Sequence, residues 1–329
     1  MLNFLVIRRT KIIFLCSLVI FPLVVLSFPY LQPWGFFGHT QINRMAVFTL
    51  PEELFGFYKK NIDYITVHAV DPDKRRYIDP KEGARHYIDL DLYETGESLP
   101  QQWYQAVSCF TVDTLEARGI SPWNIEFTYR KLVKAFRDKD NDRILHYSAD
   151  LGHYVADACV PLHTTSNYNG QQSGQTGIHA FWESRLPELF VSDYDFLVGK
   201  AQYVSDPLKE TWIILHESHA AVDSVLSIEK ELSKSISSDQ KFAPIVRNGI
   251  MTTNYSDDFS KVYHQRLGGM VERRMRRAIF AIGSFWYSAW VEAGQPELNS
   301  EKKLIVSSDS LKQTQLKMLG RQEDSGSRP

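Results

Sequence analysis

Apolar residues recur at helical spacing in several stretches of the chain, and helix-breaking residues close these stretches. Residues 40–50 (TQINRMAVFTL) follow the pattern, and Pro51 ends it. Residues 121–140 follow it more clearly, with Ser121 as the candidate N-cap and Pro122 at the first helical position. The predicted buried stripe of this second helix consists of Ile125, Phe127, Leu132, Val133 and Phe136.

Two further helices follow from the same spacing. After a polar turn, DKDND, residues 143–160 predict one helix, and residues 271–292 predict a long one that Gly294 and Pro296 stop. No run of alternating apolar and polar residues indicates strands. We therefore expect an all-α fold, with a single compact multi-helix domain over residues 34–298.

The two ends of the chain differ from this helical region. Three basic residues between positions 8 and 11 precede an apolar run over residues 12–28, the order found in a secretory signal. The run is short for a spanning helix, which needs roughly 20 apolar residues, although an uncleaved anchor stays open. We expect residues 1–28 to direct secretion or periplasmic export, with membrane anchoring as the alternative. The polar residues 299–329 predict a disordered tail.

Composition and charge narrow the function classes only a little. The chain is 43% hydrophobic and 23% charged, as in ordinary globular proteins, and its net charge of -2 provides no basic field that would recruit nucleic acid. A nucleic-acid substrate held at a small metal site is still compatible with this charge. Outside the signal the cysteines are Cys109 and Cys159; the sequence leaves their pairing open, and Cys159 fits a buried apolar position.

Candidate chemistry concentrates between residues 153 and 183. His153 and Asp157 are four residues apart, so they share one face of a helix, and His163 follows the helix directly. After a glycine-rich loop, His179 and Glu183 repeat the same spacing. Each residue alone is more often structural, but imidazole and carboxylate groups together suit zinc.

Upstream residues extend this set of candidate ligands. The stretch WGFFGH contributes Trp34 and His39, and the stretch VDPDKRRYIDPKEGARHYID contributes Asp71 and His86. Asp73 competes with Asp71 for the same role.

Two other clusters have plainer interpretations. His146 and Asp150 repeat the four-residue spacing one heptad before His153, and a surface ion pair is the favoured interpretation over a place around the metal cluster. The basic run at residues 273–277 either covers a helix surface, which is favoured, or contacts phosphate groups.

The combined motifs resemble those of a known superfamily, which comprises the bacterial zinc-dependent phospholipases C and the single-strand-specific zinc nucleases. The resemblance rests on W-G-x-x-G-H, an Asp fifteen residues before a His, H-x-x-x-D-x-x-x-x-P-L-H and H-x-x-x-E, in this order over residues 34–183. It implies an all-helical fold that holds up to three zinc ions.

The resemblance also implies a ligand set for each ion. The first zinc would be held by Asp71, His86, His153 and Asp157. The second would be held by His163, His179 and Glu183. The third would be held by Trp34, His39 and Asp157. The family binds this last ion through the amino group of a mature N-terminal tryptophan, whereas Leu31 and Pro33 do not form a small-residue cleavage site before Trp34.

The implied activity is hydrolysis of phosphodiester bonds by metal-activated water, with Asp71 orienting the water. Glu183 and the lack of basic charge favour a phospholipase C-like enzyme acting on phospholipid, with contact to a membrane surface. A single-strand-specific nuclease or 3'-nucleotidase is the first alternative, and a non-catalytic, membrane-tethered zinc-binding protein is the second. No obligate protein partner is expected.

Overall fold

Helices account for nearly all regular structure in the described part of the chain. The computed structural model describes residues 35–93, 99–247 and 250–298. The predicted signal over residues 1–28, Trp34 and the predicted tail over residues 299–329 therefore lie outside the described residues. Within the described ranges the fold is all-α, as the sequence predicted, apart from one small β-hairpin.

The elements follow one another in a simple order. The α-helices are α1 Phe36–Ala46, α2 Glu52–Lys60, α3 Ile62–Val67, α4 Asp71–Arg75, α5 Trp103–Cys109, α6 Val112–Arg118, α7 Ser121–Arg137, α8 Asn141–Ala158, α9 Ile178–Ala180, α10 Leu186–Phe190, α11 Pro207–His219, α12 Val222–Ser235, α13 Ser238–Lys241, α14 Asp257–Arg266 and α15 Met270–Glu292. The strands are β1 Phe242–Arg247 and β2 Ile250–Tyr255. The shorter turns are the 3-10 helices Val47–Thr49, His68–Val70, Gly83–His86, Leu90–Leu92, Pro161–Thr164 and Val191–Asp193, and the π-helix Phe181–Arg185.

All four predicted helices exist, with shifts at their ends. The first, α1, begins four residues earlier than predicted. Ser121 lies inside α7 and makes no capping hydrogen bond, so its predicted role as N-cap was wrong. Phe127 was also wrongly placed in the buried stripe, because it is 43% exposed. It lies two residues from the buried Ile125, and side chains two apart point to opposite sides of a helix.

The β-hairpin is the element that the sequence did not predict. Strands β1 and β2 pair antiparallel, with Phe242 opposite Tyr255 at the base. The Tyr255 ring stacks on Phe181 at a centroid distance of 3.7 Å. A lone two-stranded hairpin is marginal in water, so contacts of this kind with the helical core stabilise it.

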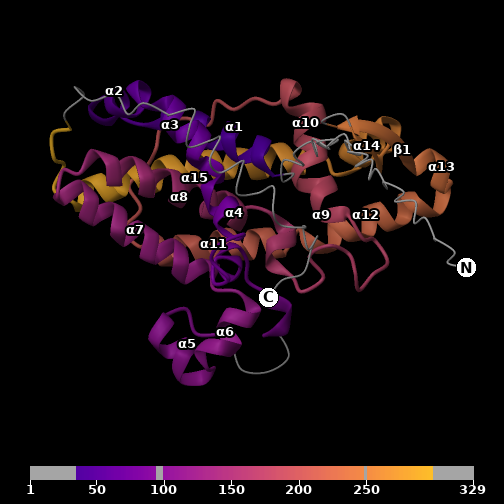
Figure 1. The fold of residues 1–329 in the computed structure, drawn as a ribbon, viewed down its shortest axis with the longest axis horizontal. Helices are drawn as coiled ribbons and strands as arrows, with labels where there is room; N and C mark the ends of the chain where they lie inside the picture. The colour runs from indigo at the N-terminus through magenta and orange to yellow at the C-terminus, as the bar shows by residue number, and fades with distance from the viewer. Residues whose placement is uncertain (1–34, 94–98, 248–249, 299–329) are drawn as a thin grey trace, which may run out of the picture.

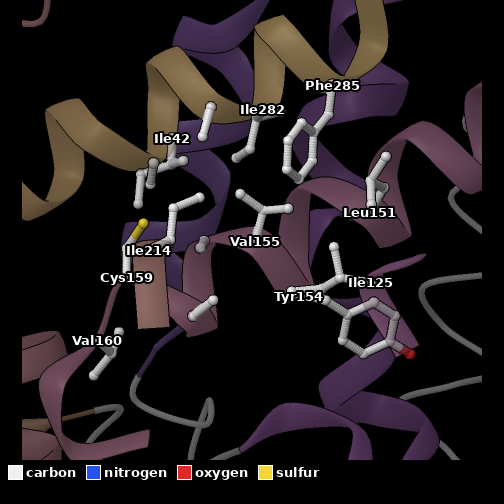
Figure 2. Packing of buried hydrophobic residues seen from close by; sticks show 14 of the residues in the cluster. Ile42, Ile125, Leu151, Tyr154, Val155, Cys159, Val160, Ile214, Ile282 and Phe285 are labelled. Carbon is white, nitrogen blue, oxygen red and sulfur yellow. The ribbon is translucent and has the colours of Figure 1, made fainter. Parts of the chain in front are cut away.

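The hydrophobic core lies between α1, α7, α8 and α15 (Figure 1). Helices α8 and α15 contact each other and both contact α1 and α7. Its buried side chains come from positions as far apart as Ile42 and Trp290. Figure 2 shows this packing around Val155 of α8, with Ile42, Ile282 and Phe285 nearby. Because one side of α8 is anchored in this core, its other side can present polar residues at fixed positions.

Gly152 lets α1 and α8 approach closely at this point. A Cβ atom at Gly152 would lie 2.2 Å from Oδ1 of Asn43, a fully buried side chain that donates to the Ala149 carbonyl at 3.1 Å. We expect Gly152→Ala to lower the free energy of unfolding by about 1–3 kcal/mol through this overpacking. Chemical denaturation measures the change.

Gly56 is the matched control for this substitution. It lies on the exposed surface of α2, and a Cβ there meets no atom within 4 Å. Gly56→Ala should therefore stabilise the helix by up to about 1 kcal/mol. Equal effects of the two substitutions would contradict the close approach of α1 and α8.

The fold answers two questions that the sequence raised, namely whether the two cysteines pair and whether a helix could span a membrane. Cys109 is exposed and Cys159 is buried, and both are free thiols, so they do not pair. In the part of the chain that the structure describes, no helix combines the length and the apolar character needed to cross a bilayer.

Candidate metal centre

Five histidines and three carboxylates meet at the polar side of α8, which itself carries His153 and Asp157. Four overlapping groups have ligand atoms within 4.8 Å of one another. These groups are His39 with Asp73 and His153, His86 with His153 and Asp157, His163 with His179 and Glu183, and His39 with Asp157 and Glu183.

Asp157 lies at the middle of this cluster. Its Oδ2 atom is 2.9 Å from His86 Nδ1 and 3.2 Å from His153 Nε2. Its Oδ1 atom is 3.3 Å from His39 Nε2 and 3.9 Å from His163 Nε2. Each carboxylate oxygen thus faces a different pair of imidazoles, which is the arrangement needed to bridge two cations.

Glu183 organises the neighbouring part of the cluster in the same way. Its Oε2 atom is 2.7 Å from His179 Nε2 and 3.4 Å from His163 Nε2, and its Oε1 atom is 3.5 Å from His39 Nε2. The π-helical turn Phe181–Arg185 carries Glu183, directly after the short helix α9 that carries His179.

Backbone carbonyls set the proton positions of three of these histidines. The Nδ1 atoms of His153, His163 and His179 donate to the carbonyls of Ala69, His86 and Tyr168 at 2.8, 2.7 and 3.2 Å. A neutral imidazole has one N–H group, so each Nε2 then presents a lone pair to the carboxylates of the cluster. Two acceptors that face each other require a proton or a cation between them. The donor set therefore fits a metal such as zinc.

The titration of the groups is consistent with a site that attracts positive charge. Burial alone lowers the pKa of His39, but hydrogen bonds to Asp157 and Glu183 outweigh it and raise that pKa well above its usual value. Burial also lowers the pKa of His163, but the nearby Asp157 and Glu183 carboxylates outweigh this effect and raise that pKa to about 9. Burial would raise the pKa of Asp157, but the charges of His153 and His163 hold it well below its usual value.

This titration predicts opposite pH effects on stability and on zinc affinity. The folded pKa of His163, about 9, lies above its unfolded value. The stabilisation it contributes to the metal-free protein is therefore complete below the unfolded pKa of about 6.5 and is lost as pH rises through 9. Zinc must displace the same proton, so zinc affinity should increase over this range.

Two measurements at pH 6 and pH 9 check this prediction. Denaturant unfolding in the presence of a chelator gives the stability of the metal-free protein, and competitive titration gives zinc affinity. A zinc affinity that falls between pH 6 and pH 9 would be the opposite of what we expect.

The structure separates the two carboxylates that competed for a place in the cluster. Asp71 was predicted as a ligand and as the residue that orients water, but it bonds instead to His68 Nδ1 and to Lys74 Nζ. Asp73 Oδ1 lies 3.8 Å from both His86 Nδ1 and His153 Nε2. Residues two apart on α4 face opposite ways, so only one of them can point into the cluster. Asp73 points toward the cluster, and Asp71 points away from it to His68 and Lys74.

One buried acid near the cluster was missed in the sequence. Glu82 is fully buried, and its Oε1 atom lies 3.6 Å from His86 Nε2. Burial would raise the pKa of Glu82, but the nearby His86 imidazole, the hydrogen bond from Tyr154 and the charge of Arg75 lower it to about 2. The four-residue spacing of Glu82 and His86 is the signal that applied to His153 with Asp157, so it was available in the sequence.

The two clusters with plainer interpretations lie at the surface as favoured, but protein contacts hold them more firmly than the sequence indicated. Asp150 lies 3.6 Å from the half-exposed His146, but it is itself buried and accepts two hydrogen bonds from Arg75. In the basic run, Arg274 donates to the Cys159 carbonyl at 2.9 Å and Arg277 to Glu217 at 3.0 Å. These arginines tie α15 to α8 and α11 and are already occupied by protein groups.

The third predicted zinc site is described only in part. His39, Asp157 and Glu183 come together, but Trp34 lies outside the described residues. Gly35 is placed against this group, since a Cβ atom there would lie 2.6 Å from Glu183 Oε1. An apolar hollow adjoins the same side of the cluster, lined by residues that include His39, Trp182, Glu183 and Met275.

Comparison with known proteins agrees with this geometry. The family model described as zinc-dependent phospholipase C matches residues 38–241, which is more than half of the chain. These residues include every described side chain of the cluster. A search among curated proteins finds no match. On the basis of this match, which spans more than half of its length, the chain belongs to the zinc-dependent phospholipase C family.

Proposed function

We propose that this protein hydrolyses the phosphodiester bond of phospholipids in the manner of a phospholipase C and uses up to three zinc ions. The observation that carries the proposal is the Asp157 carboxylate, whose two oxygens face four imidazoles. We assign the ions to three ligand groups. They are Asp73, His86, His153 and Asp157 for the first, His163, His179 and Glu183 for the second, and His39, Asp157 and Trp34 for the third.

Zinc at these positions would neutralise phosphate charge and lower the pKa of a bound water to about 7. The chain contributes the orientation of the ligands. The carbonyls of Ala69, His86 and Tyr168 hold three imidazoles with their free Nε2 atoms inward. Asp73 lies at the edge of the cluster, where it can accept a proton from the attacking water.

Solvent access favours catalysis over a purely structural role for the metal. A structural zinc site is closed by protein ligands, whereas a catalytic site keeps an open position. His153 and Asp157 are buried, but the side chains of Asp73, Glu183 and His179 remain 15%, 14% and 24% exposed. This open edge gives a substrate a route to the cluster and argues against the non-catalytic zinc-binding protein.

Family membership supports phospholipid over nucleic acid as the substrate. Of the aromatic side chains near the site, Tyr87 and Phe181 are buried and cannot stack on bases, whereas Phe36, Phe37 and Tyr168 are half-buried. The choice of phospholipid therefore rests on the family match. We also propose that residues 1–28 export the protein, which would place it where it meets lipid surfaces.

One assay tests the proposal against its alternatives. The full-length protein loaded with zinc is given phosphatidylcholine vesicles and single-stranded DNA in parallel, with diacylglycerol and nucleotides as the measured products. We expect diacylglycerol. Nucleotide release alone would support the nuclease, and bound zinc without turnover of either substrate would support the binding protein.

A further inference from the structure

Behind the metal cluster lies a network of charged residues that are not themselves predicted metal ligands. Glu82 is fully buried between α8 and the turn Gly83–His86. We propose that Glu82 is the positioning residue for His86, in that it orients the imidazole ring toward the metal. This role depends on the proposed zinc centre. We further propose that Arg75 extends this scaffold to Asp73, so that one buried ion network orients two ligands of the first zinc.

His86 differs from the neighbouring histidines in the ring nitrogen that it directs inward. Its Nδ1 atom faces Asp157 at 2.9 Å, whereas its Nε2 atom points away from the cluster, 3.6 Å from Glu82 Oε1. His153, His163 and His179 do the reverse and donate Nδ1–H to carbonyls. At 3.6 Å this contact is longer than a hydrogen bond, and the buried Nε2 atom has no hydrogen-bond partner among the described residues. The nearby negative charge of Glu82 still favours the proton on Nε2, which leaves the Nδ1 lone pair for the metal.

Glu82 is itself held by groups that keep it charged. Arg85 Nη1 and the Tyr154 hydroxyl donate to its two oxygens, and Arg75 Nη2 lies 3.6 Å from Oε1. A buried carboxylate is costly unless it is paired and hydrogen-bonded, and these partners fulfil that condition. Because all three contacts act on one side chain, its position relative to His86 has little freedom.

Arg75 connects this network to the second ligand. Its two terminal nitrogens donate to Asp150 at 3.1 and 2.8 Å, and one of them also donates to the Tyr154 hydroxyl at 3.1 Å. Asp150 and Tyr154 lie on α8, whereas Arg75 lies on α4 two residues after Asp73. The bidentate pair therefore docks α4 onto α8 and places Asp73 beside His153.

This network explains why an acidic residue recurs one heptad before Asp157 in the sequence. Asp150 lies one heptad before Asp157, on nearly the same face of α8. Asp157 contacts the imidazoles directly. Asp150 instead binds Arg75, which docks α4 and its Asp73 against the cluster. Of the pair His146 and Asp150, Asp150 is therefore the member that supports the cluster, whereas His146 is about half exposed.

The test replaces Glu82 with glutamine, which keeps the shape and removes the charge. We expect Glu82→Gln to bind the first zinc about 10–100-fold more weakly, with the affinity of the His163, His179 and Glu183 group unchanged. Competitive titration with a chromogenic chelator measures both affinities. The absorption spectrum of the cobalt-substituted protein should change for the first site only, because cobalt reports ligand geometry.

Asp79→Asn is the matched control. Asp79 also pairs with Arg85, at 3.4 Å, but its side chain is 41% exposed and it has no contact with His86. This variant should keep wild-type zinc affinities and an unchanged cobalt spectrum. If Glu82→Gln fails to fold, Tyr154→Phe takes its place, since it removes a single hydroxyl from the network, and we expect it to weaken the first zinc about tenfold.

The outcomes separate this inference from the proposed function. Wild-type affinities in Glu82→Gln, or in Tyr154→Phe where it replaces it, would overturn the positioning role while leaving the zinc centre intact. An equal loss at all ions together with a lower Tm of the metal-free protein would show that Glu82 serves folding alone. Wild-type protein that binds no zinc would overturn the proposed function itself.

Discussion

Replacing Asp157 with asparagine is expected to remove bound zinc and hydrolytic activity together. Asp157 contacts both halves of the cluster through its carboxylate, since it faces His86 and His153 on one side and His39 and His163 on the other. An amide cannot supply the negative charge that two cations share. We expect activity to fall by more than about 100-fold, because even residues that only support ligands change affinity or activity by 10–100-fold.

The measurements are zinc content by elemental analysis and kcat/KM on a chromogenic phosphodiester. Asp142→Asn is the control, because Asp142 lies on the same helix but is exposed at its first turn. It should leave both quantities unchanged. An Asp157→Asn protein with full zinc content and wild-type turnover would show that the cluster is not the catalytic centre.

Asp73→Asn should also lose more than about 100-fold in activity, while Asp71→Asn, two residues away, changes activity by less than about fivefold. Asp73 Oδ1 points to His86 and His153. Asp71 forms partly exposed pairs with His68 and Lys74, and such pairs are worth about 1 kcal/mol or less.

The two variants serve as controls for each other, since each removes one carboxylate charge from α4. Zinc affinity, kcat and the Tm of the metal-free protein should be measured for both. A larger loss in Asp71→Asn would restore the assignment made from sequence spacing and would contradict the orientation of α4. Equal losses would mean that α4 acts as a unit and that neither carboxylate is a specific ligand.

Local sequence signals were sufficient for the long helices. Helices α7, α8 and α15 have apolar residues at helical spacing and end near breakers, so they form close to where the pattern predicts. The same signals failed where a residue's neighbours along the chain do not decide its surroundings. Phe127 is apolar but exposed, and the β-hairpin depends on stacking against Phe181.

The candidate ligands also divide into those that local spacing predicted and those that depend on the fold. Pairs four residues apart on one helix, such as His153 with Asp157, are close in space whatever the rest of the fold does. The choice between Asp71 and Asp73 could not be made in this way. It depends on which face of the short helix α4 meets α8, and the pairing of Arg75 with Asp150 sets that face.

By itself, the sequence determined that this protein is helical, that its histidines and carboxylates suit zinc, and which family its motifs resemble. Helical periodicity and i,i+4 spacing are local properties, so they can be read without knowing the fold. Only the tertiary structure decided that Asp73 rather than Asp71 faces the cluster and that Glu82 lies behind His86. These placements depend on contacts between α4, α8 and the turn before His86, which come together because the chain folds around one core.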